Sequence, residues 1–319
     1  MTIWLWVGFL VFVMAMLALD LGVFHRKLHA ISIKEAMLWT GFWIFLSLLF
    51  NILIYFMYEH HWLGIGEAIG HTLSGKEAAL QFLTGYFIEK SLSLDNIFVI
   101  ALIFTYFKIP DIYQHRVLFW GILGALIMRG LMIGGGIALI TKFGWMIYVF
   151  GAFLIFTAIK MITSQEENID PDRNIFVKFV RRIYPVSKTL DGEKFFTAVN
   201  GKHAVTPMFI ALVVIESSDL LFAVDSIPAI FAVTLDPFIV FTSNVFAILG
   251  LRSLYFALSA MLAKFRFIKL SLSFILAYVG VKMLISAWLH IAAWVSLIVI
   301  FLLLLAGIMT SILIKPSKD

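Results

Sequence analysis

Long apolar segments dominate the chain and are separated by short polar stretches. A helix needs about 20 apolar residues to cross the hydrocarbon of a membrane. Unbroken hydrophobic runs predict helices here, because barrel strands show about ten residues of alternating polarity. The nine expected spans cover residues 3–24, 36–58, 79–107, 117–140, 143–163, 207–231, 237–260, 268–288 and 290–314. We therefore predict an all-α, polytopic membrane helix bundle with about nine transmembrane helices, of which the third is long enough to tilt or break.

Composition supports this pattern and excludes a soluble enzyme. Of the 319 residues, 62% are hydrophobic and 13% are charged, whereas soluble domains are roughly 45–50% apolar and 25% charged. The absence of cysteine excludes disulfides, thiolate metal sites and a cysteine nucleophile. No nucleotide-binding loop or Ser/His/Asp triad appears, so we expect no enzymatic activity and no permanently bound cofactor.

The positions of the cations predict the orientation of the chain. Eighteen of the 24 Lys and Arg residues fall in the segments 25–35, 108–116, 160–206, 261–269 and 315–319. Such residues gather on the cytoplasmic side of a membrane, so we expect the N-terminus outside and the C-terminus in the cytosol. Arg26 and Lys27 follow the first span and no cation precedes it, which argues against a cleaved signal peptide. Topology thus accounts for the net charge of +5, and the expected partner is the lipid bilayer, not nucleic acid.

Spans three to five resemble spans six to eight. The matching pairs, at offsets of 122 to 124, are Asp95 with Asp219, Arg129 with Arg252, and Lys160 with Lys282. A repeat of three spans is inverted in its second copy, as in many secondary transporters. The predicted division is two N-terminal spans (1–78), a first repeat (79–164), a cytosolic loop with a helical piece (165–206), a second repeat (207–288), and a last span with its tail (289–319).

Five carboxylates lie in the first helices of the two repeats, and they are the sharpest functional signal. They are Glu89 and Asp95 in span three and Glu216, Asp219 and Asp225 in span six. An acid at the centre of the bilayer costs about 2.5–3.5 kcal/mol. These side chains must therefore be paired, protonated or directed into a polar cavity.

Helical spacing places Glu216 and Asp219 on one face, while Asp225 lies nearly opposite Glu216. Pro228 follows closely, and proline removes a helical hydrogen bond and restricts the residue before it. We therefore expect spans three and six to unwind or kink beside their acids and to expose backbone carbonyls.

The donors in these motifs are all oxygen atoms, which suit hard cations such as Mg²⁺, Ca²⁺ or Mn²⁺ and disfavour zinc and copper. A proton path is also compatible with these acids. Asn96 and Asn244 are weaker candidate ligands. Arg129 and Arg252 are expected either to lock the bundle by pairing with the acids or to balance their charge when no ion is bound.

The two acidic motifs carry a resemblance to a known family. The stretches from Glu89 to Val99 and from Asp219 to Val233, together with 236–252, resemble the TerC family of bacterial integral membrane proteins, and in particular its Alx-like branch. The similarity covers nearly the whole chain.

The resemblance implies a bacterial inner-membrane protein related to the LysE transporter superfamily, with a history of tellurite-resistance naming and a link to manganese export. It selects Mn²⁺ over Mg²⁺ and Ca²⁺. Protons are a candidate counter-ion, because close carboxylates can also carry them. The alternatives are a metallation factor that works with the secretion machinery and a membrane stress or redox factor. The family's acidic positions match Glu89, Asp95, Glu216, Asp219 and Asp225, and Asn96 follows Asp95 in its motif. These six residues are the expected metal ligands.

Overall fold

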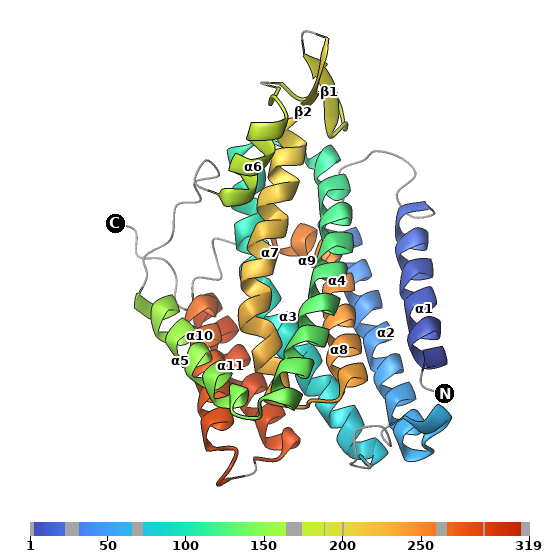
Figure 1. Ribbon diagram of the computed structural model, residues 1–319, viewed down its shortest axis with the longest axis vertical. Helices are drawn as coiled ribbons and strands as arrows, with labels where there is room; N and C mark the ends of the chain where they lie inside the picture. The colour runs from blue at the N-terminus through green and yellow to red at the C-terminus, as the bar shows by residue number, and fades with distance from the viewer. Residues whose placement is uncertain are drawn as a thin grey trace.

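The computed structural model describes residues 3–22, 32–65, 73–163, 174–187, 189–199, 201–259, 267–289 and 291–313. Helices account for most of these residues (Figure 1). In chain order the elements are α1 (Ile3–Gly22), α2 (Ile33–Glu59), the 3₁₀ turn η1 (Trp62–Gly64), α3 (Gly75–Tyr106), α4 (Asp111–Lys142), α5 (Met146–Thr163), α6 (Ile175–Ile183), β1 (Phe196–Val199), β2 (Lys202–Val205), α7 (Pro207–Phe231), α8 (Pro237–Leu249), α9 (Leu251–Ser259), α10 (Ile268–Ile285) and α11 (Ala293–Leu313).

The all-α membrane bundle is confirmed. Among the described residues, seven helical segments are long and apolar enough to cross a membrane: α2, α4, α5, α7, α8 with α9, α10 and α11. Helix α1 has a shorter apolar stretch, Ile3–Leu19. Helix α3 has 32 residues but carries the charges of the first acidic motif, so it does not qualify by composition. The expected total of nine crossings stays a prediction.

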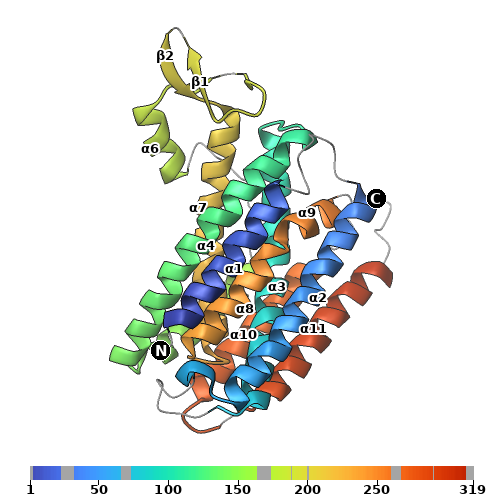
Figure 2. The same cartoon turned by 90° about the vertical axis from the view of Figure 1, so that its right-hand side faces the viewer.

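The helices run side by side along the long axis (Figures 1 and 2). The N-terminus lies at the same end as the α4–α5 and α10–α11 connections, whereas the β-hairpin projects from the opposite end. This distribution of connections between the two ends agrees with the expected topology. Which end faces the cytosol stays a prediction. Eight of the cations behind it lie outside the described residues: Arg26, Lys27, Arg173, Lys188, Lys264, Arg266, Lys315 and Lys318.

The expected interruption of spans three and six is wrong. Helix α3 continues without a break from Gly75 to Tyr106, and α7 continues from Pro207 to Phe231. Pro228 stands in the final turn of α7, so its missing N–H removes a single bond near the helix end. Buried packing from Ile227 to Phe231 holds that turn in place. At 1.5 Å per residue α3 is about 48 Å long, which is longer than a 30 Å hydrocarbon layer, so it must tilt or extend beyond that layer.

The interruption occurs instead in span seven, which was expected to be continuous. Helix α8 ends at Leu249, Gly250 is its C-cap, and α9 starts at Leu251. A Cβ atom at Gly250 would lie 2.9 Å from Nζ of Lys90 and 3.1 Å from Cβ of Trp43, so glycine allows this close approach. From Phe238 to Leu249, nearly every residue of α8 is buried in protein, which makes α8 the central helix of the bundle.

Helices of the two proposed repeats pack against each other reciprocally. Helix α3 packs on α8 and α4 packs on α7, while α3 also meets α7, α4 meets α8, and α5 meets α10. Two inverted copies would make these contacts, although the repeat itself stays a prediction. Close α5–α10 packing depends on small residues, because a Cβ atom at Gly280 would lie 2.8 Å from the carbonyl oxygen of Gly151.

The segment between the two proposed repeats contains both the expected helical piece, α6, and an unexpected hairpin. Strands β1 and β2 pair antiparallel, with Phe196 opposite Val205 and Val199 opposite Lys202. Asp191 supports the approach to the hairpin by accepting a hydrogen bond of 2.9 Å from the Thr197 hydroxyl. Thr206, the N-cap of α7, donates its hydroxyl to the Lys194 carbonyl at 2.8 Å and so ties the approach to the hairpin to the start of α7.

A buried arginine cluster as the candidate functional site

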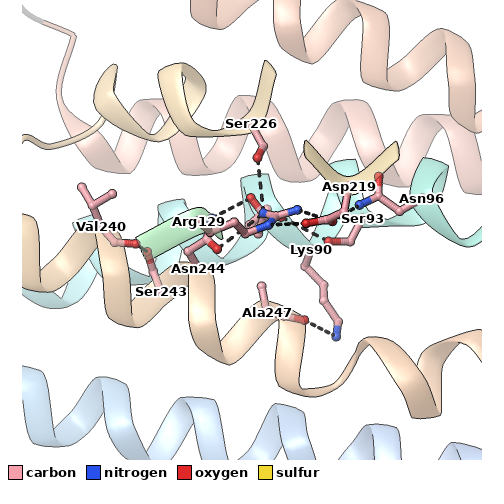
Figure 3. A network of polar contacts seen from close by, with 11 residues as sticks. Lys90, Ser93, Asn96, Arg129, Asp219, Ser226, Val240, Ser243, Asn244 and Ala247 are labelled. Carbon is pink, nitrogen blue, oxygen red and sulfur yellow. Dashed lines mark hydrogen bonds and ion pairs between the residues drawn. The ribbon is translucent and has the colours of Figure 1, made fainter. Parts of the chain in front are cut away.

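Arg129 on α4 is the centre of the candidate site, and its side chain is only 2% exposed. Its Nε and Nη2 atoms donate hydrogen bonds to the two carboxylate oxygens of Asp219 on α7, at 3.2 and 2.9 Å. Its Nη1 atom forms an ion pair with Glu89 on α3. One guanidinium group thus joins three helices by binding two carboxylates at once (Figure 3).

Neutral side chains complete the hydrogen bonding of these acids. Asn244 on α8 donates its Nδ2 to Glu89 at 3.0 Å, and Ser93 donates its hydroxyl to Glu89 at 3.4 Å. Asn96 donates its Nδ2 to Asp219 at 3.2 Å. Ser226 lies 3.4 Å from Nη1 of Arg129. The cluster draws on α3, α4, α7 and α8, the helices that form the centre of the bundle.

Two carboxylates against one guanidinium leave the cluster with a formal charge of −1. Glu89 is 1% exposed and Asp219 is 12% exposed, so water screens this charge poorly. Low dielectric strengthens hydrogen bonds that are made and raises the cost of those that are missing. A buried site with this charge attracts a cation or a proton.

Asp95 and Asp225 form a separate acidic pair that faces α5 and α10. The Thr157 hydroxyl on α5 donates a 3.0 Å hydrogen bond to Asp225. Asp225 lies within electrostatic range of Asp95 and of Lys160, and Asp95 lies within range of Lys269. All five residues are outside the hydrogen-bonded network of Arg129.

Glu216 lies against α4 at a third position. A Cβ atom at Gly124 would overlap the Glu216 carboxylate, so only glycine leaves space for this acid. Its Oε2 atom is buried and has no hydrogen-bond partner in the described part of the chain. Glu216 and Asp219 both face α4, as their helical spacing predicts.

A cavity of about 30 Å³ borders the cluster. That volume exceeds what one water molecule needs. The polar side chains on its wall belong to Asn96, Ser218, Asp219 and Arg252, and the rest of the wall is apolar. The Oδ1 atom of Asn96 is buried without a partner among the described residues, which leaves one amide oxygen beside the cavity able to bind a cation or water.

The predicted metal residues therefore divide into three groups. Glu89, Asp219 and Asn96 meet at Arg129, Asp95 and Asp225 lie together elsewhere, and Glu216 stands beside Gly124. Within the described ranges, no three Asp, Glu, Cys or His side chains converge in a way that would hold a metal ion. One arginine and not a ring of acids is the organising group.

Sequence reasoning missed Ser226 and Thr157. Ser226 follows Asp225 directly, so its place in the acidic motif was a usable signal. Thr157 stands three residues before Lys160, which puts both on one face of α5. Lys90 on α3 is not part of the cluster, because its Nζ donates to the Ala247 carbonyl at 3.2 Å, away from Arg129 (Figure 3).

Comparison with known proteins finds membrane proteins of similar sequence. An uncharacterized membrane protein of Myxococcus xanthus, STKORF319, is 49% identical over 318 residues, covering 99% of this chain and 95% of that protein. A protein of Escherichia coli strain K12 named as a candidate membrane-bound redox modulator, Alx, is 46% identical over 298 residues, covering 93% and 90% of the two chains. Its namesake in Salmonella typhi is 44% identical over 316 residues, covering 99% and 96%.

No solved structure matches the chain. Residues 74–319 match the family described as integral membrane protein TerC, a range that begins at the N-cap of α3 and includes every residue of the arginine cluster. The chain therefore belongs to the TerC family of integral membrane proteins.

Proposed function

We propose that the protein exports Mn²⁺ across the bacterial inner membrane by alternating access, with the arginine cluster as its central ion-handling site. The observation that carries the proposal is the joining of Glu89 and Asp219 by Arg129 in the middle of the bundle. A buried acid pair with a compensating cation on a third helix can exchange that cation for another one.

The chemistry of the donors supports a hard divalent ion. Carboxylate oxygens of Glu89 and Asp219, the free amide oxygen of Asn96 and the Asn244 amide are oxygen ligands of the kind that Mn²⁺ accepts. The adjacent cavity allows the ion to keep a water molecule. The family resemblance favours Mn²⁺ over Mg²⁺ and Ca²⁺.

Transport then follows from competition between the ion and the guanidinium group. An arriving Mn²⁺ displaces Arg129 from the two carboxylates, and Arg129 returns when the ion leaves. The three helices joined by Arg129 must shift during this exchange, which couples binding to movement of the two halves. Asp95, Asp225 and Glu216 lie beyond the cluster, where they are placed to pass the ion along or to carry counter-transported protons.

The direct test is Mn²⁺ flux in liposomes that contain only the purified protein and a dye quenched by Mn²⁺. We expect Asp219→Asn to lower the initial rate at least about tenfold, since one lost ion contact of about 1.4 kcal/mol has that effect. The matched control is Asp236→Asn. Asp236 is also buried and accepts a 2.6 Å hydrogen bond from Tyr58. It caps the start of α8, and its hydrogen bonds among the described residues do not include Arg129.

An equal loss of flux in both variants would mean that replacing a buried acid lowers flux by destabilising the protein. It would contradict the assignment of Asp219 as an ion ligand. Wild-type flux in Asp219→Asn would contradict it as well. In cells, the same variant should accumulate Mn²⁺ under manganese stress.

Two other functions remain as alternatives. A metallation factor would co-purify with the secretion machinery and show no flux in liposomes. A redox modulator is suggested by the names of the relatives from Escherichia coli and Salmonella typhi. The chain has no cysteine, so a redox role here would need chemistry other than thiol exchange, and the absorption spectrum of the purified protein tests for a redox cofactor.

A further inference from the structure

Helix α6 presents three chemically different sectors, although it has only nine residues. Val177 is fully buried, and α6 packs on α7. At about 100° per residue, a second sector of roughly 100° contains four exposed apolar side chains, Ile175, Phe176, Phe179 and Ile183. The third sector contains the cations Lys178, Arg181 and Arg182.

The exposed apolar sector is unusual for a helix surrounded by water. Ile175 is 74% exposed and Phe179 is 65% exposed. Large apolar side chains grouped on one side of a basic helix are typical of helices that lie in the membrane interface, with their cations among the head groups. Scattered single exposed apolar residues would need no such explanation.

A hydrogen bond fixes the height of α6 against the membrane-spanning helix α7. Asn174, the N-cap of α6, donates its Nδ2 to the Ser217 hydroxyl at 2.6 Å. Ser217 follows the first residue of α7, Pro207, by ten positions, or about 15 Å along the helix axis. The 25 residues of α7 span about 37 Å, only some 7 Å more than the hydrocarbon layer. If that excess lies at the start of α7, Ser217 and the start of α6 lie about 8 Å inside the hydrocarbon boundary. That depth is within the roughly 5–10 Å to which the apolar face of an interfacial helix is buried.

We propose that α6 is an interfacial helix that binds the anionic lipid surface of the membrane, with Phe176, Phe179 and Ile183 in the acyl boundary and Lys178 and Arg182 on lipid phosphates. The cation distribution along the chain predicts that this end of the bundle faces the cytosol, where anionic lipids attract basic segments. Charge complementarity thus favours lipid over a second protein as the occupant. This binding site is independent of which ion the bundle transports.

The absence of cysteine permits a clean test on the full-length protein. A single cysteine is introduced as Phe179→Cys and carries a nitroxide spin label, with Ile183→Cys as a second position on the same sector. Matched controls are Lys178→Cys on the basic sector and Lys202→Cys on β2. Each protein is reconstituted in phosphatidylcholine vesicles with or without about one third phosphatidylglycerol.

Collisions with oxygen report lipid, and collisions with a soluble nickel chelate report water. We expect the labels at positions 179 and 183 to favour oxygen in the anionic vesicles and the labels at 178 and 202 to favour nickel. Adding Lys178→Gln and Arg182→Gln to the 179-labelled protein should lower the ratio of inserted to free label by about fivefold per cation.

Three results would overturn the proposal. Labels at positions 179 and 183 that are as open to nickel as the label at 202 in anionic vesicles would show that the helix does not insert. Spin–spin broadening between those labels that disappears on dilution with unlabelled protein would identify a second copy as the occupant. Insertion that is unaffected both by anionic lipid and by the two glutamine substitutions would contradict the role of the cations.

Discussion

Replacing Arg129 with methionine is the sharpest test of how the cluster holds the bundle together. Methionine keeps much of the length and apolar volume of the side chain but removes every donor. Glu89 and Asp219 then face each other without the guanidinium group that joins them. The change leaves buried carboxylates uncompensated on α3 and α7.

The expected magnitude follows from burial. Arg129 is 2% exposed and Glu89 is 1% exposed, so this pair has almost no access to water. Removing one partner of such a pair costs about 3–5 kcal/mol. Total stabilities are roughly 5–15 kcal/mol, so Arg129→Met should remove a large share. Arg129→Lys should lose less, because lysine keeps the charge but not the two-pronged geometry.

Reversible unfolding in mixed micelles with increasing sodium dodecyl sulfate, followed by the fluorescence of the nine tryptophans, gives the free energies of unfolding. A third protein combines Arg129→Met with Glu89→Gln and Asp219→Asn. It should regain most of the lost stability, since removing all the charges avoids the penalty of leaving some of them buried alone.

Two results would refute this reasoning. A loss of less than about 1 kcal/mol in the free energy of unfolding of Arg129→Met would show that the ion pairs of Arg129 contribute no more than exposed surface ion pairs do. A triple variant no more stable than Arg129→Met would show that packing and not charge compensation is the contribution of Arg129.

Three further predictions concern other parts of the molecule. Gly280→Ala should lower the midpoint of the same detergent titration, because its Cβ atom would contact α5, whereas Gly134→Ala has nothing within 4 Å and should not. Lys90→Met should speed amide hydrogen exchange in α9, since it removes a donor to the last turn of α8, while exchange in α1 stays unchanged. Hydrogen bonds from Thr197 and then Lys194 lower the pKa of Asp191, so this carboxylate stabilises the hairpin at neutral pH. That contribution should disappear as the pH falls below about 4. Amide hydrogen exchange should show β1 and β2 losing protection over this pH range in the wild type but not in Asp191→Asn.

Hydrophobic length predicted where the helices lie, because only helices satisfy their backbone within lipid. It did not predict where a helix breaks. Pro228 had the stronger local signal, yet a proline in a final turn costs little, and the break came at Gly250. There Lys90 and Trp43 approach the backbone closely, which is a tertiary contact that no local pattern encodes.

For the candidate site, the sequence predicted the residues but not the contacts between them. Acids inside spans had to find partners, and helical spacing correctly put Glu216 and Asp219 on one face. The proposed repeat pairs Asp95 with Asp219 and Arg129 with Arg252, so the sequence offered no means to choose which acid Arg129 would bind. The packing of α4 on α7 decides it. The hairpin was missed because its strands have only four residues each.

The burial of α8 has a consequence for the biogenesis of the protein. Among the seven candidate spans, α8 with α9 is the most deeply buried in protein and has the lowest hydropathy. Its polar residues, such as Asn244, would lack hydrogen-bond partners if the segment entered the bilayer before it packed against other helices. Its packing partners α3 and α4 precede it in the chain and are synthesised first. The order of the helices therefore gives the least hydrophobic of the seven candidate spans a protein surface to pack against as it leaves the ribosome, so that its insertion and its folding occur in one step.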